Sequence, residues 1–252
     1  MSLWRPVSAC GGQCLTGAGQ GRRVPAVVLR VVAAAGVLIS GLVLVPLLRG
    51  RGVRTLARML LAALGVQLVW RGPAPRPGSL LVANHISWID VLALLAVAPT
   101  RLVAKREVGA WPLIGAVARA SGAIFLDRSR PRRLPAAVVQ VAATLRAGHS
   151  VAVFPEGTTF CGAERGRFRP AVFQAAIDAQ APVVPISIRY GSPAAAFIGD
   201  DTLWSSIRRV VAQRGLTVTL VGAPALRPEP GAGRRALARA AQASASIYDL
   251  AA

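Results

Sequence analysis

The sequence predicts an α/β fold: a mixed, mostly parallel sheet with helices on both faces, preceded by an N-terminal membrane-associated pair of helices. Two observations carry this prediction. From residue 80 onward, short β-branched runs alternate with longer helical patterns, which is typical of helices packed on a sheet. Before them, residues 31–48 carry no charge, and at about 1.5 Å per residue they nearly span a hydrocarbon core of about 30 Å.

The N-terminal part divides into a tail and an anchor. Residues 1–23 are rich in glycine, lack apolar periodicity and are expected to form a flexible tail. Residues 24–70 are expected to form membrane anchor helices, since arginines follow the uncharged run directly where a signal peptide would have a cleavage site. The second apolar stretch, Leu56–Trp70, ends in an interfacial tryptophan. Two helices entering one leaflet, one span followed by an interfacial helix, and a buried pair of core helices all remain open.

A linker of prolines and glycines, residues 71–78, follows the anchor and opens a domain at residues 71–252. The candidate strands are Leu80–Ala83, Leu102–Ala104, Ala123–Leu126, Val151–Phe154, Val183–Ile188 and Thr217–Val221. The candidate helices are Val91–Val97, Pro135–Arg146, Pro170–Ala179, Leu203–Gln213 and Arg234–Leu250.

The composition favours contact with lipid. Hydrophobic residues make up 54% of the chain and charged residues only 16%, against about 25% in a soluble domain. The net charge is +20, and 29 of the 30 basic residues are arginines, an excess to which genomic composition bias contributes. Such a chain attracts polyanions. Because aromatic residues reach only 5% and the arginines are spread along the chain, we expect an anionic membrane and no nucleic acid as partner.

The cysteines predict neither a metal site nor a disulfide framework. Cys10 and Cys14 lie in the glycine-rich tail, Cys161 is isolated, and no histidine stands at ligand spacing. Three cysteines fit reduced thiols in a cytoplasmic compartment.

The first strand of the domain runs directly into a candidate catalytic pair, His85 and Asp90. The carboxyl end of a strand is where open α/β sheets place their ligands. A carboxylate beyond the turn can bond one imidazole nitrogen and leave the other as a base. A helix-capping Asp90 with a core histidine is the alternative. The second histidine, His149, is expected in a solvated loop.

A second cluster follows the strand at 151–154: Phe154-Pro155-Glu156-Gly157-Thr158-Thr159. Proline ends the strand, glycine lets a ligand approach the backbone, and the threonines offer donors. This turn suits an anion or a polyol, although ordinary turn chemistry would use the same residues.

Together these blocks resemble the 1-acylglycerol-3-phosphate acyltransferase family. Four motifs occur in the family's order, over about residues 80–190: the His-x4-Asp block, Gly-x-x-Phe-x-x-Arg, Phe-Pro-Glu-Gly-Thr and Val-Pro-Ile. In this sequence they are His85 to Asp90, Gly122 to Arg128, Phe154 to Thr158 and Val184 to Ile186. The resemblance implies transfer of a fatty acyl group from acyl-CoA or acyl carrier protein to the hydroxyl of lysophosphatidic acid, giving phosphatidic acid. It implies no cofactor, and a membrane-bound enzyme whose catalytic domain lies on the cytoplasmic face of the cell membrane.

The resemblance also assigns roles. His85 is the expected base, and Asp90 orients it. The expected substrate-binding residues are Arg128, Glu156, Gly157, Thr158, Lys105 and Arg169. Arg128 would bind the acceptor phosphate, Gly157 and Thr158 would line the same pocket, and Glu156 would bond the glycerol or position Arg128. Lys105 would meet phosphate or carrier, with a plain surface lysine as the alternative.

One departure from the family leaves the acceptor open. The commonest third block continues with arginine, and Thr159 stands there instead. A second cation would come from Arg165, Arg167 or Arg169, of which Arg169 is favoured because it precedes a helix start. Alternatively the acceptor is a different lysolipid, such as lyso-ornithine lipid. A serine hydrolase is disfavoured because no Gly-x-Ser-x-Gly elbow occurs.

Overall fold

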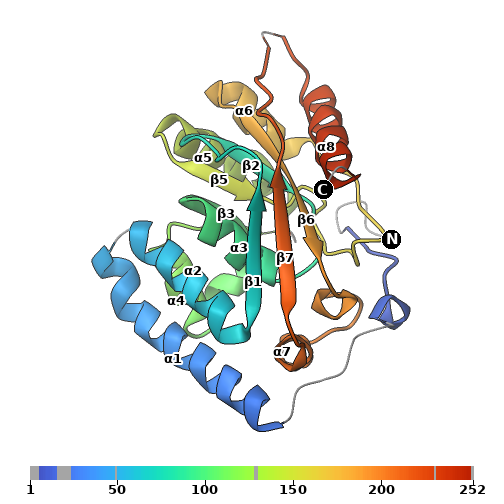
Figure 1. Cartoon of the computed structure of the whole chain (residues 1–252). Helices are drawn as coiled ribbons and strands as arrows, with labels where there is room; N and C mark the ends of the chain where they lie inside the picture. The colour runs from blue at the N-terminus through green and yellow to red at the C-terminus, as the bar shows by residue number, and fades with distance from the viewer. Residues whose placement is uncertain (1–5, 16–23, 49, 128–129, 230, 251–252) are drawn as a thin grey trace.

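The computed structural model describes residues 6–15, 24–48, 50–127, 130–229 and 231–250, which contain one seven-stranded sheet (Figure 1). Its order is β1-β7-β6-β2-β5-β3-β4. The strands β6, β2, β5, β3 and β4 are parallel, whereas β7 is antiparallel to β6 and parallel to β1. The sheet is therefore mixed and mostly parallel, as the sequence predicts. The strands are β1 (Val66–Arg71), β2 (Leu80–Ala83), β3 (Thr100–Lys105), β4 (Ile124–Leu126), β5 (Ser150–Val153), β6 (Val183–Tyr190) and β7 (Leu216–Gly222).

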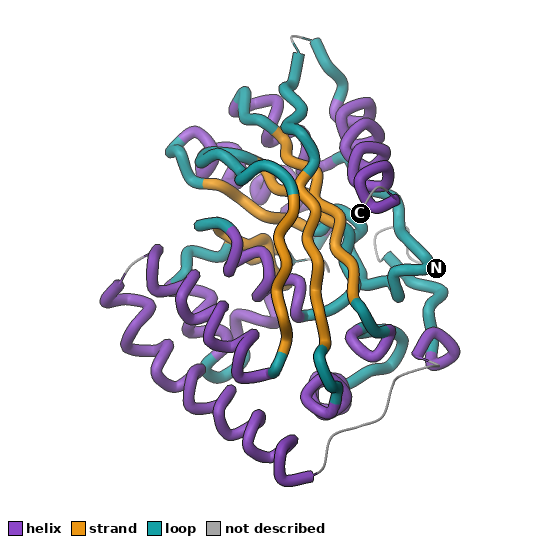
Figure 2. Tube along the Cα trace, in the orientation of Figure 1, coloured by secondary structure: helices purple, strands orange, loops and turns teal. Residues whose placement is uncertain are grey.

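Helices cover both faces of the sheet, and Figure 2 shows the strands side by side between them. On one face, Leu61, Leu94 and Val210 join one buried cluster, and they come from three different helices. On the other face, Leu145, Phe173 and Leu237 belong to a second cluster. The first face carries α1 (Val24–Leu48), α2 (Gly50–Leu64), α3 (Ile89–Val97) and α7 (Leu203–Ala212), and the second carries α5 (Leu134–Arg146), α6 (Ala171–Ala179) and α8 (Arg234–Leu250).

Every strand and helix predicted from residue 80 onward is present, and its ends differ by at most two residues. The sequence did not predict α4 (Ile114–Ala120), which contacts α1 and begins after Leu113, a residue with a positive φ of 58°. It is a helix of seven residues, too short to show a helical period.

The predicted second anchor helix, Leu56–Trp70, is wrong in its last part. The helix α2 ends at Leu64, and Gly65 adopts a left-handed conformation with φ 72°. The residues that follow form β1, paired with β7 from Val66↔Leu216 onward. The apolar residues of this partly buried edge strand continue the apolar run of α2, so periodicity could not separate the two elements. The sheet therefore begins inside the segment 24–70, which was predicted to consist of anchor helices alone.

The helices α1 and α2 form the pair that the sequence predicts before the sheet, packed against each other (Figure 1). Gly41 of α1 faces Leu56 of α2, and a Cβ at Gly41 would lie 2.7 Å from that side chain. Arg30, in the second turn of α1, donates from Nη1 to the carbonyls of Val211 and Gln213 at 2.9 and 3.0 Å. Residues 24–43 are long and apolar enough to cross a membrane, and 6% of that window is buried.

Of the predicted flexible tail, residues 6–15 contact the domain through Cys10, while Val7 is exposed; residues 1–5 and 16–23 lie outside the described residues. The segment ends in a 3-10 turn, η1 (Gly12–Leu15). Cys10 is 4% exposed and packs with Ile86, Ala196 and Ile198. Its thiol lies with those of Cys14 and Cys161 within 4.8 Å of one another, so the prediction that Cys161 is isolated is also wrong.

Candidate active site

The candidate site lies at the carboxyl edge of three adjacent parallel strands, β6, β2 and β5. His85 follows β2, Glu156 follows β5, and Tyr190 ends β6. Because parallel strands end at the same edge, residues more than 100 positions apart meet there.

Asn84 holds the end of β2 against β6. Its side-chain amide donates to the carbonyl of Ile188 at 3.0 Å and accepts from the amide of Ile188 at 2.7 Å. The side chain thus bonds Ile188 as a neighbouring strand would, after the β2 backbone has turned away. This contact determines where the His85 turn leaves the sheet.

Asp90 organises that turn. Its Oδ2 accepts hydrogen bonds from the amides of Ile86 and Ser87, at 2.7 and 2.9 Å, and lies 2.9 Å from His85 Nδ1. Asp90 is fully buried and stands in the first turn of α3, where the helix dipole favours a negative charge. The four residues between His85 and Asp90 therefore form a turn that folds around the Asp90 carboxylate. The structure brings the predicted pair together.

The other Asp90 oxygen is bonded by a residue that the sequence analysis missed. Tyr190 donates from its hydroxyl to Oδ1 at 2.5 Å. Burial, and then the charge of Asp90, raises the pKa of Tyr190 well above its usual value, so the hydroxyl stays protonated and acts as donor. No local motif marks this tyrosine, since only the β2–β6 pairing places it beside α3.

Phe154 supports the imidazole from below. The rings of Phe154 and His85 are stacked, with centroids 3.9 Å apart and 11° between their planes. With Nδ1 bonded to Asp90 and one face covered, His85 presents Nε2, to which no described residue bonds, and its side chain is 19% exposed. A neutral imidazole held in this way can remove a proton from a hydroxyl group.

Glu156 contacts the protein itself, where the sequence expected it to bond the glycerol or position Arg128. Its Oε2 accepts from the amide of His85 at 2.7 Å, and its Oε1 accepts from the amide of Gly166 at 3.0 Å. The residue is 3% exposed. It therefore ties the loop after β5 to the His85 turn. Burial raises its pKa to about 7, against the lowering effect of the two amide donors.

The residues after Glu156 form an exposed rim. Gly157 has φ 78°, a conformation that glycine adopts readily, and the Arg169 side chain passes beside it. Thr158 is partly exposed on the same turn. The hydroxyl of Thr159 donates to the carbonyl of Phe197, so it is committed to the protein. Of the predicted binding residues, Gly157, Thr158 and Arg169 thus lie together beside the turn that carries Glu156.

Of two further predicted cations, Lys105 does not lie beside His85, and Arg128 is not among the described residues. Lys105 is exposed at the end of β3, and β5 lies between β3 and β2. Asp127, the residue before Arg128, is buried at the end of β4, and its Oδ2 lies 3.2 Å from Arg106 Nη1. By strand spacing, β4 is about 14 Å from β2.

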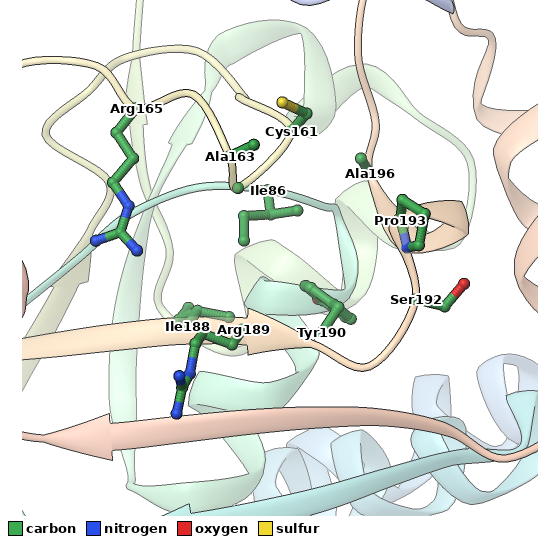
Figure 3. A pocket seen from close by; sticks show the side chains of 11 residues that line it. Ile86, Cys161, Ala163, Arg165, Ile188, Arg189, Tyr190, Ser192, Pro193 and Ala196 are labelled. Carbon is green, nitrogen blue, oxygen red and sulfur yellow. The ribbon is translucent and has the colours of Figure 1, made fainter. Parts of the chain in front are cut away.

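A pocket of about 300 Å³ adjoins the His85 turn and is lined by two cations, Arg165 and Arg189 (Figure 3). Ile86 and Tyr190 line it from the catalytic side. Arg165 enters from the loop after β5 and Arg189 from β6 (Figure 3). Arg165 is one of three arginines that the sequence left open, whereas Arg189 was missed because it lies within a strand.

The comparisons with known proteins identify a family for the chain. A family model described as Acyltransferase matches residues 69–189. The chain is 37% identical over 181 residues to a 1-acyl-sn-glycerol-3-phosphate acyltransferase of Neisseria meningitidis, covering 68% of this chain and 69% of that protein. It is 39% identical over 202 residues to a lyso-ornithine lipid O-acyltransferase of Pseudomonas aeruginosa, covering 77% of each.

The fold is also found among solved structures. The crystal structure of a 1-acyl-sn-glycerophosphate acyltransferase from Thermotoga maritima matches with a TM-score of 0.68, over 90% of this chain and 94% of that chain, at 19% identity. At that identity the likeness concerns the fold.

Proposed function

Because the chain belongs to the 1-acylglycerol-3-phosphate acyltransferase family, we propose that it moves a fatty acyl group from an acyl thioester to the free hydroxyl of lysophosphatidic acid, giving phosphatidic acid. The donor is acyl-CoA or acyl carrier protein, and no cofactor takes part. The observation that carries the proposal is the His85–Asp90 pair, bonded at 2.9 Å with Nε2 directed away from the carboxylate.

In this reaction Nε2 of His85 takes the proton of the acceptor hydroxyl while the oxygen attacks the thioester carbonyl. Asp90 bonds Nδ1 and stabilises the imidazolium that forms. The carbon–sulfur bond then breaks, and the imidazolium returns the proton to the leaving thiolate. A thiolate leaves readily, so both substrates can react directly when they are held side by side, without an acyl-enzyme.

The test of this function is acyl transfer by the purified full chain. We expect turnover of lysophosphatidic acid with an acyl thioester, and its loss in His85→Ala. His149→Ala is the matched control, since His149 is exposed and remote from the Asp90 carboxylate. Full activity of a folded His85→Ala protein would contradict the proposed role of His85 as the base.

The acceptor is proposed from charge. A phosphate monoester carries between about one and two negative charges at neutral pH and needs several donors when it is bound. Arg165 and Arg189 line the pocket beside Ile86, and Arg169 lies beside Gly157. Arg128, in the family motif, is the further cation that we propose for the phosphate.

A lyso-ornithine lipid is the second candidate acceptor. It is favoured by Thr159, which replaces the family's usual arginine and bonds the carbonyl of Phe197. Turnover of both acceptors by wild type and by Arg128→Ala separates the candidates. Lysophosphatidic acid predicts strong dependence on Arg128; turnover of the aminolipid alone would replace our first choice and leave His85 and Asp90 in their roles.

We also propose that the enzyme lies on the cytoplasmic face of the cell membrane, with α1 in one leaflet. The outward side chains of α1 are apolar, and Val28, Val32 and Ile39 are each more than half exposed. The bonds of Arg30 to carbonyl groups near the end of α7 would hold the helix along the domain. Replacing Val28, Val32 and Ile39 by glutamine should release the protein from membranes at high salt, whereas the same change at exposed Val139 of α5 should not. Retention of the triple variant on membranes would contradict this placement.

A further inference from the structure

Three thiols from distant parts of the chain meet beside the candidate active site. The sulfurs of Cys10, Cys14 and Cys161 all lie within 4.8 Å of one another. Cys10 and Cys14 belong to the N-terminal segment 6–15, and Cys161 stands in the loop after β5. They are the only cysteines of the chain. The acyltransfer chemistry uses none of them.

Backbone amides also donate hydrogen bonds to two of these sulfurs. The amide of Cys161 donates to Cys10 Sγ at 3.3 Å, and the amide of Glu164 donates to Cys161 Sγ at 3.5 Å. Amide hydrogen bonds of this kind orient sulfur ligands and stabilise their charge in metal sites. Cys10 is 4% exposed, whereas Cys14 and Cys161 are partly exposed, which leaves a path for an ion.

The distances suit a metal ion better than a disulfide. Sulfurs bound to one zinc ion at about 2.3 Å in tetrahedral geometry lie about 3.8 Å apart, so each pair here needs to close by at most about 1 Å. A disulfide needs about 2.05 Å and would use only two of the three thiols. Among the hard and soft metals, three sulfur ligands select a thiophilic ion such as Zn²⁺.

We propose that Cys10, Cys14 and Cys161 bind one zinc ion, with a water molecule as the fourth ligand. The ion joins the N-terminal segment to the loop after β5. That loop bonds the catalytic turn directly, since the amide of Phe160 donates to the carbonyl of His85 at 2.8 Å. The site is therefore a structural clamp next to the catalytic histidine, and it does not depend on which acceptor the enzyme uses.

The first test is metal content. The full chain, purified in detergent with reductant and supplied with Zn²⁺, is expected to retain one zinc per chain after exhaustive dialysis, measured by mass spectrometry of the elements. Each of Cys10→Ser, Cys14→Ser and Cys161→Ser should lower zinc retention at least tenfold. Ser8→Ala is the matched control: its hydroxyl accepts from the Cys10 amide at 3.2 Å but supplies no sulfur, so it should keep the ion.

A second test does not depend on how the variants fold. In the wild-type chain, Co²⁺ alone should give a thiolate-to-metal charge-transfer band in the near ultraviolet, and Zn²⁺ should abolish it. Zinc should also protect all three thiols from alkylation and slow hydrogen exchange in residues 6–15. Three freely alkylated thiols in the presence of Zn²⁺, or a disulfide between any two of them in the purified chain, would overturn the proposal.

Discussion

The two halves of the candidate site are built in opposite ways. The catalytic half is buried and held by backbone groups: Asp90 is fully buried and accepts the amides of Ile86 and Ser87, and Glu156 accepts the amide of His85. The half proposed to bind the acceptor contains arginines on its outer rim, such as Arg165 and Arg169, which are exposed on the loop after β5. The proton-transfer geometry is thus preorganised, whereas the acceptor contacts lie where side chains can change without disturbing the sheet.

Under the proposed function, this difference would explain why relatives named for different acceptors are similar to the chain. The chain is 37% identical to an enzyme named for one acceptor and 39% identical to an enzyme named for another. A shared catalytic turn with an exchangeable rim permits such a divergence. Substitutions in one half at a time therefore test how independent the two halves are.

The largest effect is expected at the catalytic base. His85→Ala should lower kcat about 10²–10⁴-fold, since a positioned base contributes that much. Asp90→Asn should lower kcat strongly as well, because a neutral amide oxygen at the position of Oδ2 would no longer stabilise the imidazolium by its charge. Steady-state kinetics with a far-ultraviolet circular dichroism spectrum as folding control measure both. Equal losses for the two acceptors confirm that this half serves either one; different losses would contradict the division.

Glu156 should make stability depend on pH. Its pKa is about 7 in the fold and about 4.5 in the unfolded chain, so the protonated form favours folding. The stabilisation is complete below pH 4.5 and is lost as the pH rises through 7, up to about 3 kcal/mol. The stability of wild type relative to Glu156→Gln should therefore fall between pH 5 and pH 7.5, as measured by thermal unfolding. Exposed Glu107→Gln should show no such trend. If the difference in stability between wild type and Glu156→Gln does not change between pH 5 and pH 7.5, the Glu156 carboxylate is ionised over that whole range.

The same contrast explains what the sequence could predict. The strand–turn–helix at 80–97 was predictable because Asp90 lies five residues from the histidine that it orients. Tyr190 was not, since its bond to Asp90 depends on β6 lying beside β2, 100 residues away in the chain. The strand β1 was missed because its apolar residues continue those of α2. The thiol cluster was missed because Cys10 and Cys161, which share a hydrogen bond, are 151 positions apart in the sequence.

At the rim, Arg128→Ala and Arg165→Ala should each raise the KM for lysophosphatidic acid by about 10- to 100-fold, which corresponds to about 1.4–2.7 kcal/mol, with little change in kcat. The loss is confined to KM because these cations would hold the phosphate equally in ground and transition states. Arg167→Ala is the matched control, since this exposed neighbour does not line the pocket. Acceptor titration by wild type and the variants measures the effect. An equal rise in the KM for lyso-ornithine lipid would show that these arginines do not bind the phosphate specifically.

The smallest effect is expected at Tyr190, which touches both halves: its hydroxyl bonds Asp90 and its ring lines the pocket. Tyr190→Phe keeps the ring and removes one hydrogen bond to a charged group, worth about 1.5 kcal/mol, so kcat should fall about tenfold while KM stays constant. Without this donor, more negative charge remains on the Asp90 carboxylate facing the imidazole, and the acidic limb of the pH–rate profile should move to higher pH. A purely structural role would lower stability without moving that limb. The double variant Tyr190→Phe/Asp90→Asn completes the cycle: because the tyrosine acts through Asp90, it should be no slower than Asp90→Asn alone. If the losses in kcat of the two single variants add in the double variant, Tyr190 acts through the pocket and not through Asp90.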